Sequence, residues 1–181
     1  MELRKAVDNL YFYDPQFEPA ASKFVGEVGG STATQAVTRW DDVKAAMAGH
    51  ALVKFLVFDT HGRPGAVCLR DGTQIEGIDL MVVSAYPQFL RSEVRVLFLG
   101  CNIGEGSLGD QFIGDVGKYF LRGKGGIVGA TTVPNIVLQL GPFASESYMQ
   151  PFSSGRLKVK RYDRTGAPIG SREVDRYGAA R

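Results

Sequence analysis

Three nearly continuous apolar runs constrain the fold of this chain more than any other feature. They occupy residues 54–59, 94–99 and 127–132. A strand with one face in water alternates apolar and polar residues, whereas a strand covered on both faces shows no such alternation. We therefore expect these runs to form the middle of a parallel sheet whose two faces are covered by helices.

Segments with helical periodicity separate the predicted strands. Apolar residues recur every three or four positions from Phe17 to Val28, and another such stripe begins at Leu108. Pro87 disturbs a further helical segment. The predicted helices cover residues 15–28, 41–48, 78–90 and 108–120, and shorter strands are predicted over residues 10–14 and 34–38. This alternation predicts an α/β fold of βαβ units with right-handed crossovers.

Two hairpins are predicted beside this alternating pattern. The first covers residues 66–75 and has its turn at Asp71-Gly72. The second pairs residues 157–162 with residues 172–175. Its Lys and Arg side chains are interpreted as a solvated face, and binding of an anionic partner is the alternative.

Length and composition exclude several classes of protein. A chain of 181 residues corresponds to one domain, or two at most. We assign residues 1–150 to the α/β domain and residues 151–181 to a basic C-terminal appendage, a hairpin of the same domain. The net charge of +2 gives no strong attraction to nucleic acid. Two cysteines and two histidines exclude a disulfide framework and a zinc finger, and no metal or cofactor is predicted.

The chain shows no sign of a membrane span or a signal peptide. No apolar run reaches the roughly 18 residues that a span requires, and the first residues lack the apolar core of a signal peptide. We expect a soluble protein made in the cytoplasm, without a membrane partner. Export without a cleavable signal peptide is the alternative, and the oligomeric state stays open.

Chemically useful side chains follow three of the predicted strands. Asp14 ends the first, His61 follows the third and Cys101 follows the fourth. Open parallel sheets bind ligands beyond the carboxyl ends of their strands. Neighbouring strands lie about 5 Å apart, so His61 and Cys101 share one site if their strands are adjacent.

A paired cysteine and histidine have a clear chemical use. A thiolate is a nucleophile, and a nearby imidazole activates it and later protonates the leaving group. The amides of Gly62 and Cys101 are candidates for an oxyanion hole. Taken singly, a cysteine or histidine at a strand end is more often a packing residue. Cys68 is interpreted as such a residue, and His50 as a solvated loop residue.

The two strand-end blocks resemble the caspase-like (clan CD) cysteine peptidases. The blocks are Phe55-Leu-Val-Phe-Asp-Thr-His61-Gly62 and Val96-Leu-Phe-Leu-Gly-Cys101. Residues 8–135 look most like the bacterial CHAT-type and DUF4347 domains, which implies a bacterial origin. Gly100 departs from the Ala or Ser that several branches of this family carry there.

The resemblance implies a fold, an activity and a site. The fold is a three-layer α/β sandwich with a central, mostly parallel sheet. The activity is a cysteine endopeptidase that cleaves protein or peptide substrates through a thioester acyl-enzyme. Cys101 is the implied nucleophile, His61 the general acid and base, and the Gly62 and Cys101 amides the oxyanion hole. Asp14 stands where the family builds a substrate pocket, so an acidic residue there implies cleavage after Lys or Arg.

Other functions fit parts of the same sequence. A catalytically inactive interaction module on the same scaffold is the main alternative. A nucleotide-binding domain is the third choice, because Gly104-Glu-Gly106-Ser-Leu-Gly109 matches the pattern G-x-G-x-x-G. The expected acidic residue at the end of the next strand is missing. An α/β-hydrolase is disfavoured because its nucleophile precedes its histidine in the chain.

Overall fold

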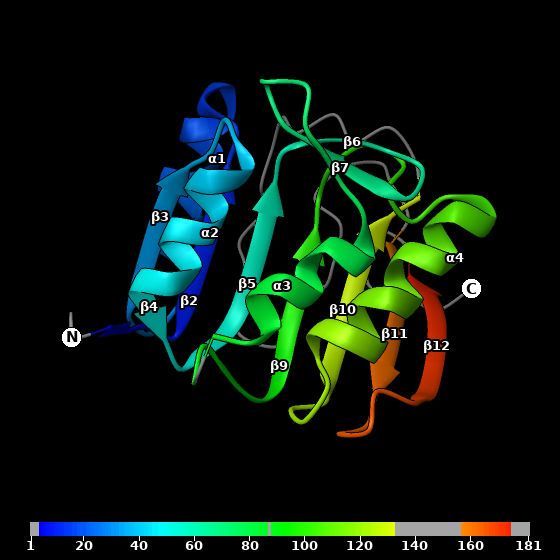
Figure 1. Cartoon of the computed structure of the whole chain (residues 1–181). Helices are drawn as coiled ribbons and strands as arrows, with labels where there is room; N and C mark the ends of the chain where they lie inside the picture. Colours follow the sequence, from blue (N-terminus) through cyan, green and yellow to red (C-terminus); the bar gives the residue numbers. More distant parts are fainter. Residues whose placement is uncertain (1–3, 87, 133–156, 175–181) are drawn as a thin grey trace.

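A computed structural model describes residues 4–86, 88–132 and 157–174, which form a mixed α/β fold around a seven-stranded sheet (Figure 1). The strand order is β12–β11–β10–β9–β5–β2–β3. The strands from β3 to β10 in this order are all parallel, whereas β11 runs antiparallel to both of its neighbours. Their bounds are β2 (Asn9–Tyr13), β3 (Thr32–Ala36), β5 (Val53–Asp59), β9 (Leu90–Phe98), β10 (Gly126–Thr131), β11 (Leu157–Tyr162) and β12 (Pro168–Val174).

The three apolar runs form adjacent central strands, as their lack of alternation predicts. β5 pairs with β9, with Phe58 opposite Phe98, and β9 pairs with β10, with Val96 opposite Val128. All four of these side chains are buried. The expectation of a mostly parallel central sheet is therefore confirmed.

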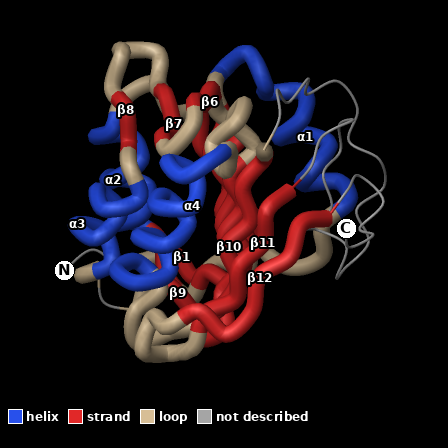
Figure 2. Tube along the Cα trace, turned by 90° about the vertical axis from the view of Figure 1, so that its right-hand side faces the viewer, coloured by secondary structure: helices blue, strands red, loops and turns tan. Residues whose placement is uncertain are grey.

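Helices cover both faces of this sheet. Figure 2 shows α1 on one side of the strands and α2, α3 and α4 on the other. Alternate residues of β5 belong to two separate hydrophobic cores: Leu56 and Phe58 face α2, α3 and α4, whereas Phe55 and Val57 face α1. The described helices are α1 (Glu18–Glu27), α2 (Trp40–Gly49), α3 (Met81–Ser84) and α4 (Gly106–Asp115), with 3₁₀ turns η1 (Pro15–Phe17) and η2 (Gly77–Leu80) and a π-helical turn η3 (Val116–Phe120).

A row of aromatic rings ties the sheet to α4. Ring centroids lie 5.0 Å apart for Phe12 and Phe58, 5.0 Å for Phe58 and Phe98, and 4.8 Å for Phe98 and Phe112. Aromatic pairs at such distances stabilise a core by about 1 kcal/mol each beyond their buried area. This row extends across β2, β5 and β9, the strands whose ends carry the candidate site.

A small second sheet lies beyond the carboxyl end of β5 (Figure 1). It consists of β6 (His61–Arg63), β7 (Ala66–Cys68) and β8 (Gln74–Ile75). The predicted hairpin is confirmed, because β7 and β8 are antiparallel and Gly72, with φ of +88°, lies in the turn between them. A further two-stranded pairing joins β1 (Lys5–Ala6) and β4 (His50–Ala51).

The predicted C-terminal hairpin is also present and extends the central sheet. β11 pairs with β10 on one side and with β12 on the other. Its basic face is neutralised in part by α4, since Lys158 Nζ and Lys160 Nζ lie 3.2 and 2.9 Å from Asp110 Oδ1. The assigned boundary at residue 150 falls outside the described residues.

Two helix predictions are wrong in detail. Among the described residues of the range 78–90, the helical ones belong to the short elements η2 and α3, and Leu90 is the first residue of β9. The helix ends early because a proline disfavours helical backbone in the residue before it. Leu108 was predicted to face the core but is 53% exposed, since α4 begins at Gly106 and presents Phe112 and Ile113 to the sheet.

No helix in the described part of the chain combines the length and apolar character needed to span a bilayer.

Candidate active site

The topology gathers the candidate residues at one edge of the sheet. The chain leaves β2 toward β3 at one side and returns to β5 on the other, which makes the carboxyl ends of β2 and β5 a switch point where open α/β sheets bind ligands. Asp14 N donates to Asp59 O over 2.9 Å, and Leu99 N donates to Phe58 O over 2.8 Å. The segments that carry Asp14, His61 and Cys101 therefore leave three adjacent strands at the same edge.

The His61-Gly62 and Gly100-Cys101 segments touch through their backbones. A Cβ atom added to Gly62 would lie 2.9 Å from the carbonyl oxygen of Cys101 and 2.5 Å from Cγ1 of Ile103. A Cβ atom on Gly100 would lie 2.8 Å from the carbonyl oxygen of His61. Both positions therefore require glycine, because a side chain at either one would collide with the backbone of the other segment. The peptides of Gly62 and Cys101 are brought together by this contact.

The loop after Cys101 is fixed onto β10. The Thr131 hydroxyl donates to the carbonyl oxygen of Gly100, and Gly104 N donates to Thr131 O over 2.7 Å. Asn102 adopts a left-handed conformation with φ of +58°. These contacts hold Cys101, which is half-buried, between β9 and the start of α4.

The glycine-rich motif serves this packing. A Cβ atom on Gly109 would lie 2.1 Å from the carbonyl carbon of Gly104, and one on Gly104 would lie 2.8 Å from Ala130 O. Both glycines therefore allow backbones to approach each other, a reason for the motif that requires no nucleotide.

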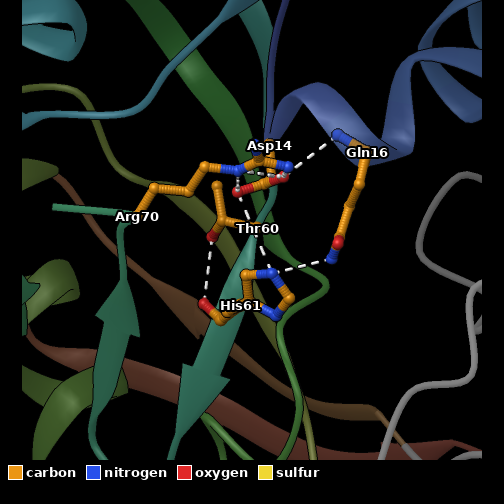
Figure 3. Close-up of polar contacts among 5 residues, drawn as sticks. All are labelled: Asp14, Gln16, Thr60, His61 and Arg70. Atoms are coloured by element: carbon orange, nitrogen blue, oxygen red, sulfur yellow. Dashed lines mark hydrogen bonds and ion pairs between the residues drawn. The ribbon is translucent and has the colours of Figure 1, made fainter. Parts of the chain in front are cut away.

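The imidazole of His61 is half exposed and has polar neighbours on one side (Figure 3). Its Nε2 atom lies 2.7 Å from Gln16 Nε2 and 3.9 Å from Asp14 Oδ2. The ring centroid of Phe17 lies 5.4 Å from that of His61. Gln16 and Phe17 both belong to the turn η1, so this one turn contacts the ring through two side chains.

Asp14 is buried and already paired with a cation. Its side chain is 2% exposed, and Arg70 binds it with Nε 3.1 and 3.0 Å from the two carboxylate oxygens and Nη2 2.8 Å from Oδ1. Burial raises the pKa of Asp14, but the hydrogen bonds from Arg70 and from the Gln16 amide outweigh it and hold that pKa below its usual value. A basic substrate side chain would have to compete with Arg70 for this carboxylate.

Sequence reasoning missed both Arg70 and Gln16. Arg70 reaches Asp14 across 56 residues of chain, from the turn between β7 and β8. No local pattern announces that pairing. A local signal for Gln16 was present, since Asp-Pro is typical of the start of a turn and Gln16 directly follows Asp14-Pro15.

Asp59 is a second buried carboxyl group near the site. It accepts a hydrogen bond from the Tyr11 hydroxyl over 2.7 Å, and its Oδ1 atom has no hydrogen-bond partner among the described residues. Burial raises the pKa of Asp59 to about 7, the nearby Asp14 charge adds to the rise, and the Tyr11 hydrogen bond opposes it. Its side chain lies with Tyr11 on the α1 side of the sheet.

Cys68 and His50, the cysteine and histidine that the sequence does not assign to the site, have different surroundings. Cys68 is half-buried and lies in a hairpin strand, where the sequence predicts a packing residue, and it is the cross-strand partner of His61 in the small sheet. Burial raises the pKa of the Cys68 thiol, and the Arg63 charge partly opposes the rise. His50 Nδ1 lies 2.7 Å from Ala46 O at the end of α2, away from the site.

Within the described ranges, no three His, Cys, Asp or Glu side chains are grouped closely enough to hold a metal ion. Comparison of the chain with protein-family models, curated proteins and solved structures gives no match. The resemblance to caspase-like peptidases therefore rests on the two sequence blocks alone.

Proposed function

We propose that this chain is a caspase-like cysteine peptidase in which Cys101 is the nucleophile and His61 the general acid and base. The observation that carries the proposal is the backbone contact of His61-Gly62 with Gly100-Cys101 at the ends of two adjacent buried strands. Helices on both faces of a mostly parallel sheet support the finer assignment of the fold as a caspase-like three-layer sandwich.

The proposed reaction passes through a thioester. The Cys101 thiol gives its proton to His61, and the thiolate attacks the carbonyl carbon of the scissile peptide bond. The C–N bond then breaks, and the leaving amine takes the proton from His61. A water molecule, deprotonated by His61, hydrolyses the thioester and restores the thiol. The amides of Gly62 and Cys101 stabilise the negative oxygen of each tetrahedral intermediate.

Peptide cleavage tests the proposal directly. A mixed peptide library is incubated with the unmodified chain and with the variants Cys101→Ala, His61→Ala and Cys68→Ala, and products are identified by mass spectrometry. We expect loss of at least about 10²-fold in rate for the first two variants. Cys68→Ala removes the chain's other thiol and is the matched control. We expect it to keep activity, because Cys68 has no role in the proposed reaction. Cleavage that survives in Cys101→Ala would contradict the proposal.

The same library measures the preference next to the scissile bond. Asp14 predicts cleavage after Arg or Lys if a substrate cation displaces Arg70 from the carboxylate. Peptides with Arg, Lys, Asp or Leu at that position distinguish the outcomes, and a preference for Asp would contradict the role of Asp14.

An inactive interaction module on the same scaffold is the second candidate. The observation in its favour is that both charged partners at the switch point, Asp14 and Arg70, are already paired with each other. Failure of the unmodified chain to cleave any peptide of the library would favour this candidate.

A further inference from the structure

The side chain of Gln16 contacts Nε2 of His61, the ring nitrogen farther from the backbone. Gln16 Nε2 is 2.7 Å from His61 Nε2, and Figure 3 shows the second ring nitrogen pointing away from both Gln16 and Asp14. We propose that Gln16 is the positioning residue of His61: its amide binds Nε2 in every protonation state, so that Nδ1 exchanges the proton with the thiol of Cys101. This inference rests on the proposed function and adds a residue to it.

The chain builds a rigid support for Gln16. Asp14 caps the turn η1, with its carboxylate accepting from Gln16 N over 3.0 Å, and Pro15 fixes the backbone at the first position of the turn. Arg70 holds the same carboxylate with three hydrogen bonds. The Asp14 carboxylate therefore anchors the backbone of Gln16, while the Gln16 side chain stays exposed beside His61.

A primary amide suits this position because it both donates and accepts. With its nitrogen toward His61, as in the structure, Gln16 donates to an unprotonated Nε2, and the proton of the neutral ring is on Nδ1. After a half-turn of the amide, Gln16 Oε1 accepts from a protonated Nε2, and Nδ1 then has a lone pair. Glutamate would only accept a hydrogen bond, and methionine, of similar length, would not bind Nε2.

The proton balance follows from this exchange. Nδ1 with its lone pair takes the proton from the Cys101 thiol, which leaves a thiolate and an imidazolium whose Nε2–H is held by Gln16 Oε1. Nδ1 later gives that proton to the leaving amine. Nε2 keeps its proton throughout, and no proton is lost to solvent in the step.

The charged and titratable groups around His61 come from several elements. Asp14 faces it from the end of β2, and Arg70 stands behind Asp14 from the turn after β7. Cys68 lies across from it on β7, and the Cys101 segment packs against its backbone from the end of β9. Asp14 cannot be substituted without loss of its buried ion pair with Arg70. Gln16 is exposed, so it can be substituted while that pair is kept.

Nuclear magnetic resonance of the His61 ring tests the inference without any need for activity. Ring nitrogen shifts are followed against pH in the Cys101→Ala chain carrying Gln16, Gln16→Glu or Gln16→Met. His50 is the internal control, because its Nδ1 contact with Ala46 O is unaffected. We expect the Glu variant to keep the imidazolium to a pH higher by about one unit than the Gln chain does. The Met variant changes the ratio of the two neutral tautomers. Superimposable His61 curves in all three chains would overturn the inference.

The same substitutions in the chain with Cys101 connect the contact to the thiol. With Gln16→Glu, alkylation of Cys101 extends to lower pH, and peptide cleavage shows a lower kcat at unchanged KM because the imidazolium holds its proton more tightly. With Gln16→Met, both rates fall by about tenfold. If the His61 titration curve shifts but the pH dependence of Cys101 alkylation does not, the Gln16 contact is supported and Cys101 is not the proton partner of His61. This outcome separates failure of the proposed function from failure of the inference.

Discussion

At the residue scale, Asp59 departs from the ordinary behaviour of an aspartate. It ends a central strand, is fully buried, and has one oxygen on the Tyr11 hydroxyl and one without a hydrogen-bond partner in the described structure. An ionised carboxylate in this place is poorly solvated, which is why its pKa rises to about 7. The folded protein therefore favours the neutral acid, and the cost of ionisation is a cost to stability.

This arrangement predicts a pH dependence of unfolding. Since the pKa of Asp59 is about 7 when folded and about 3.9 when unfolded, the stabilisation is complete below pH 4 and disappears as the pH rises through 7. The total loss is on the order of 4 kcal/mol. Asp59→Asn should remove this part of the pH dependence of the free energy of unfolding. Urea unfolding of the unmodified chain and of the variant between pH 4 and pH 8 measures the difference between their pH dependences.

Tyr11→Phe is the matched control for Asp59. The Tyr11 hydroxyl lowers the pKa of Asp59, so its removal shifts the loss of stability to higher pH. Equal pH slopes for Asp59→Asn and the unmodified chain would show that Asp59 ionises normally in the folded state.

At the scale of elements, close backbone packing joins α4 to the loop that follows Cys101. Gly109 lies directly against Gly104 in the loop that follows Cys101. We expect Gly109→Ala to lower the free energy of unfolding by at least about 2 kcal/mol, because the two backbones must separate. It also disturbs the Cys101 loop.

Gly114 provides the control on the same helix. A Cβ atom there meets nothing within 4 Å, so Gly114→Ala should raise stability by about 0.5–1 kcal/mol through helix propensity. Thermal unfolding of both variants decides the matter, and equal effects would mean that helix propensity alone acts at Gly109.

The elements also show how far sequence patterns reach. The central strands, the hairpin turn at Gly72 and the C-terminal hairpin were predicted because each depends on residues close together in the chain. The predicted length of the helix before Pro87 and the predicted burial of Leu108 were wrong, because the ends of a helix and its rotation about its axis depend on packing. The strand-end positions of His61 and Cys101 followed from local patterns, whereas the Arg70–Asp14 pair depends on tertiary contact across 56 residues.

At the scale of the whole molecule, strand order determines which side chains meet. β5 lies between β2 and β9, so the segment that carries His61 leaves the sheet between those of Asp14 and Cys101. The small sheet then places Cys68 across from His61 and directs Arg70 back to Asp14. His61 thus has one thiol on its cross-strand partner and another on the segment that packs against its backbone.

The alkylation rates of these two thiols test the central claim, that His61 activates Cys101. Cys68 is the cross-strand partner of His61, and the Cys101 segment packs against the backbone of His61-Gly62. Burial raises the pKa of the Cys68 thiol. Mass spectrometry of the intact fold treated with iodoacetamide should show Cys101 reacting at least about tenfold faster than Cys68, and His61→Ala should abolish the difference. Equal, slow reaction of the two thiols, or a fast Cys101 that is unaffected by His61→Ala, would contradict the account.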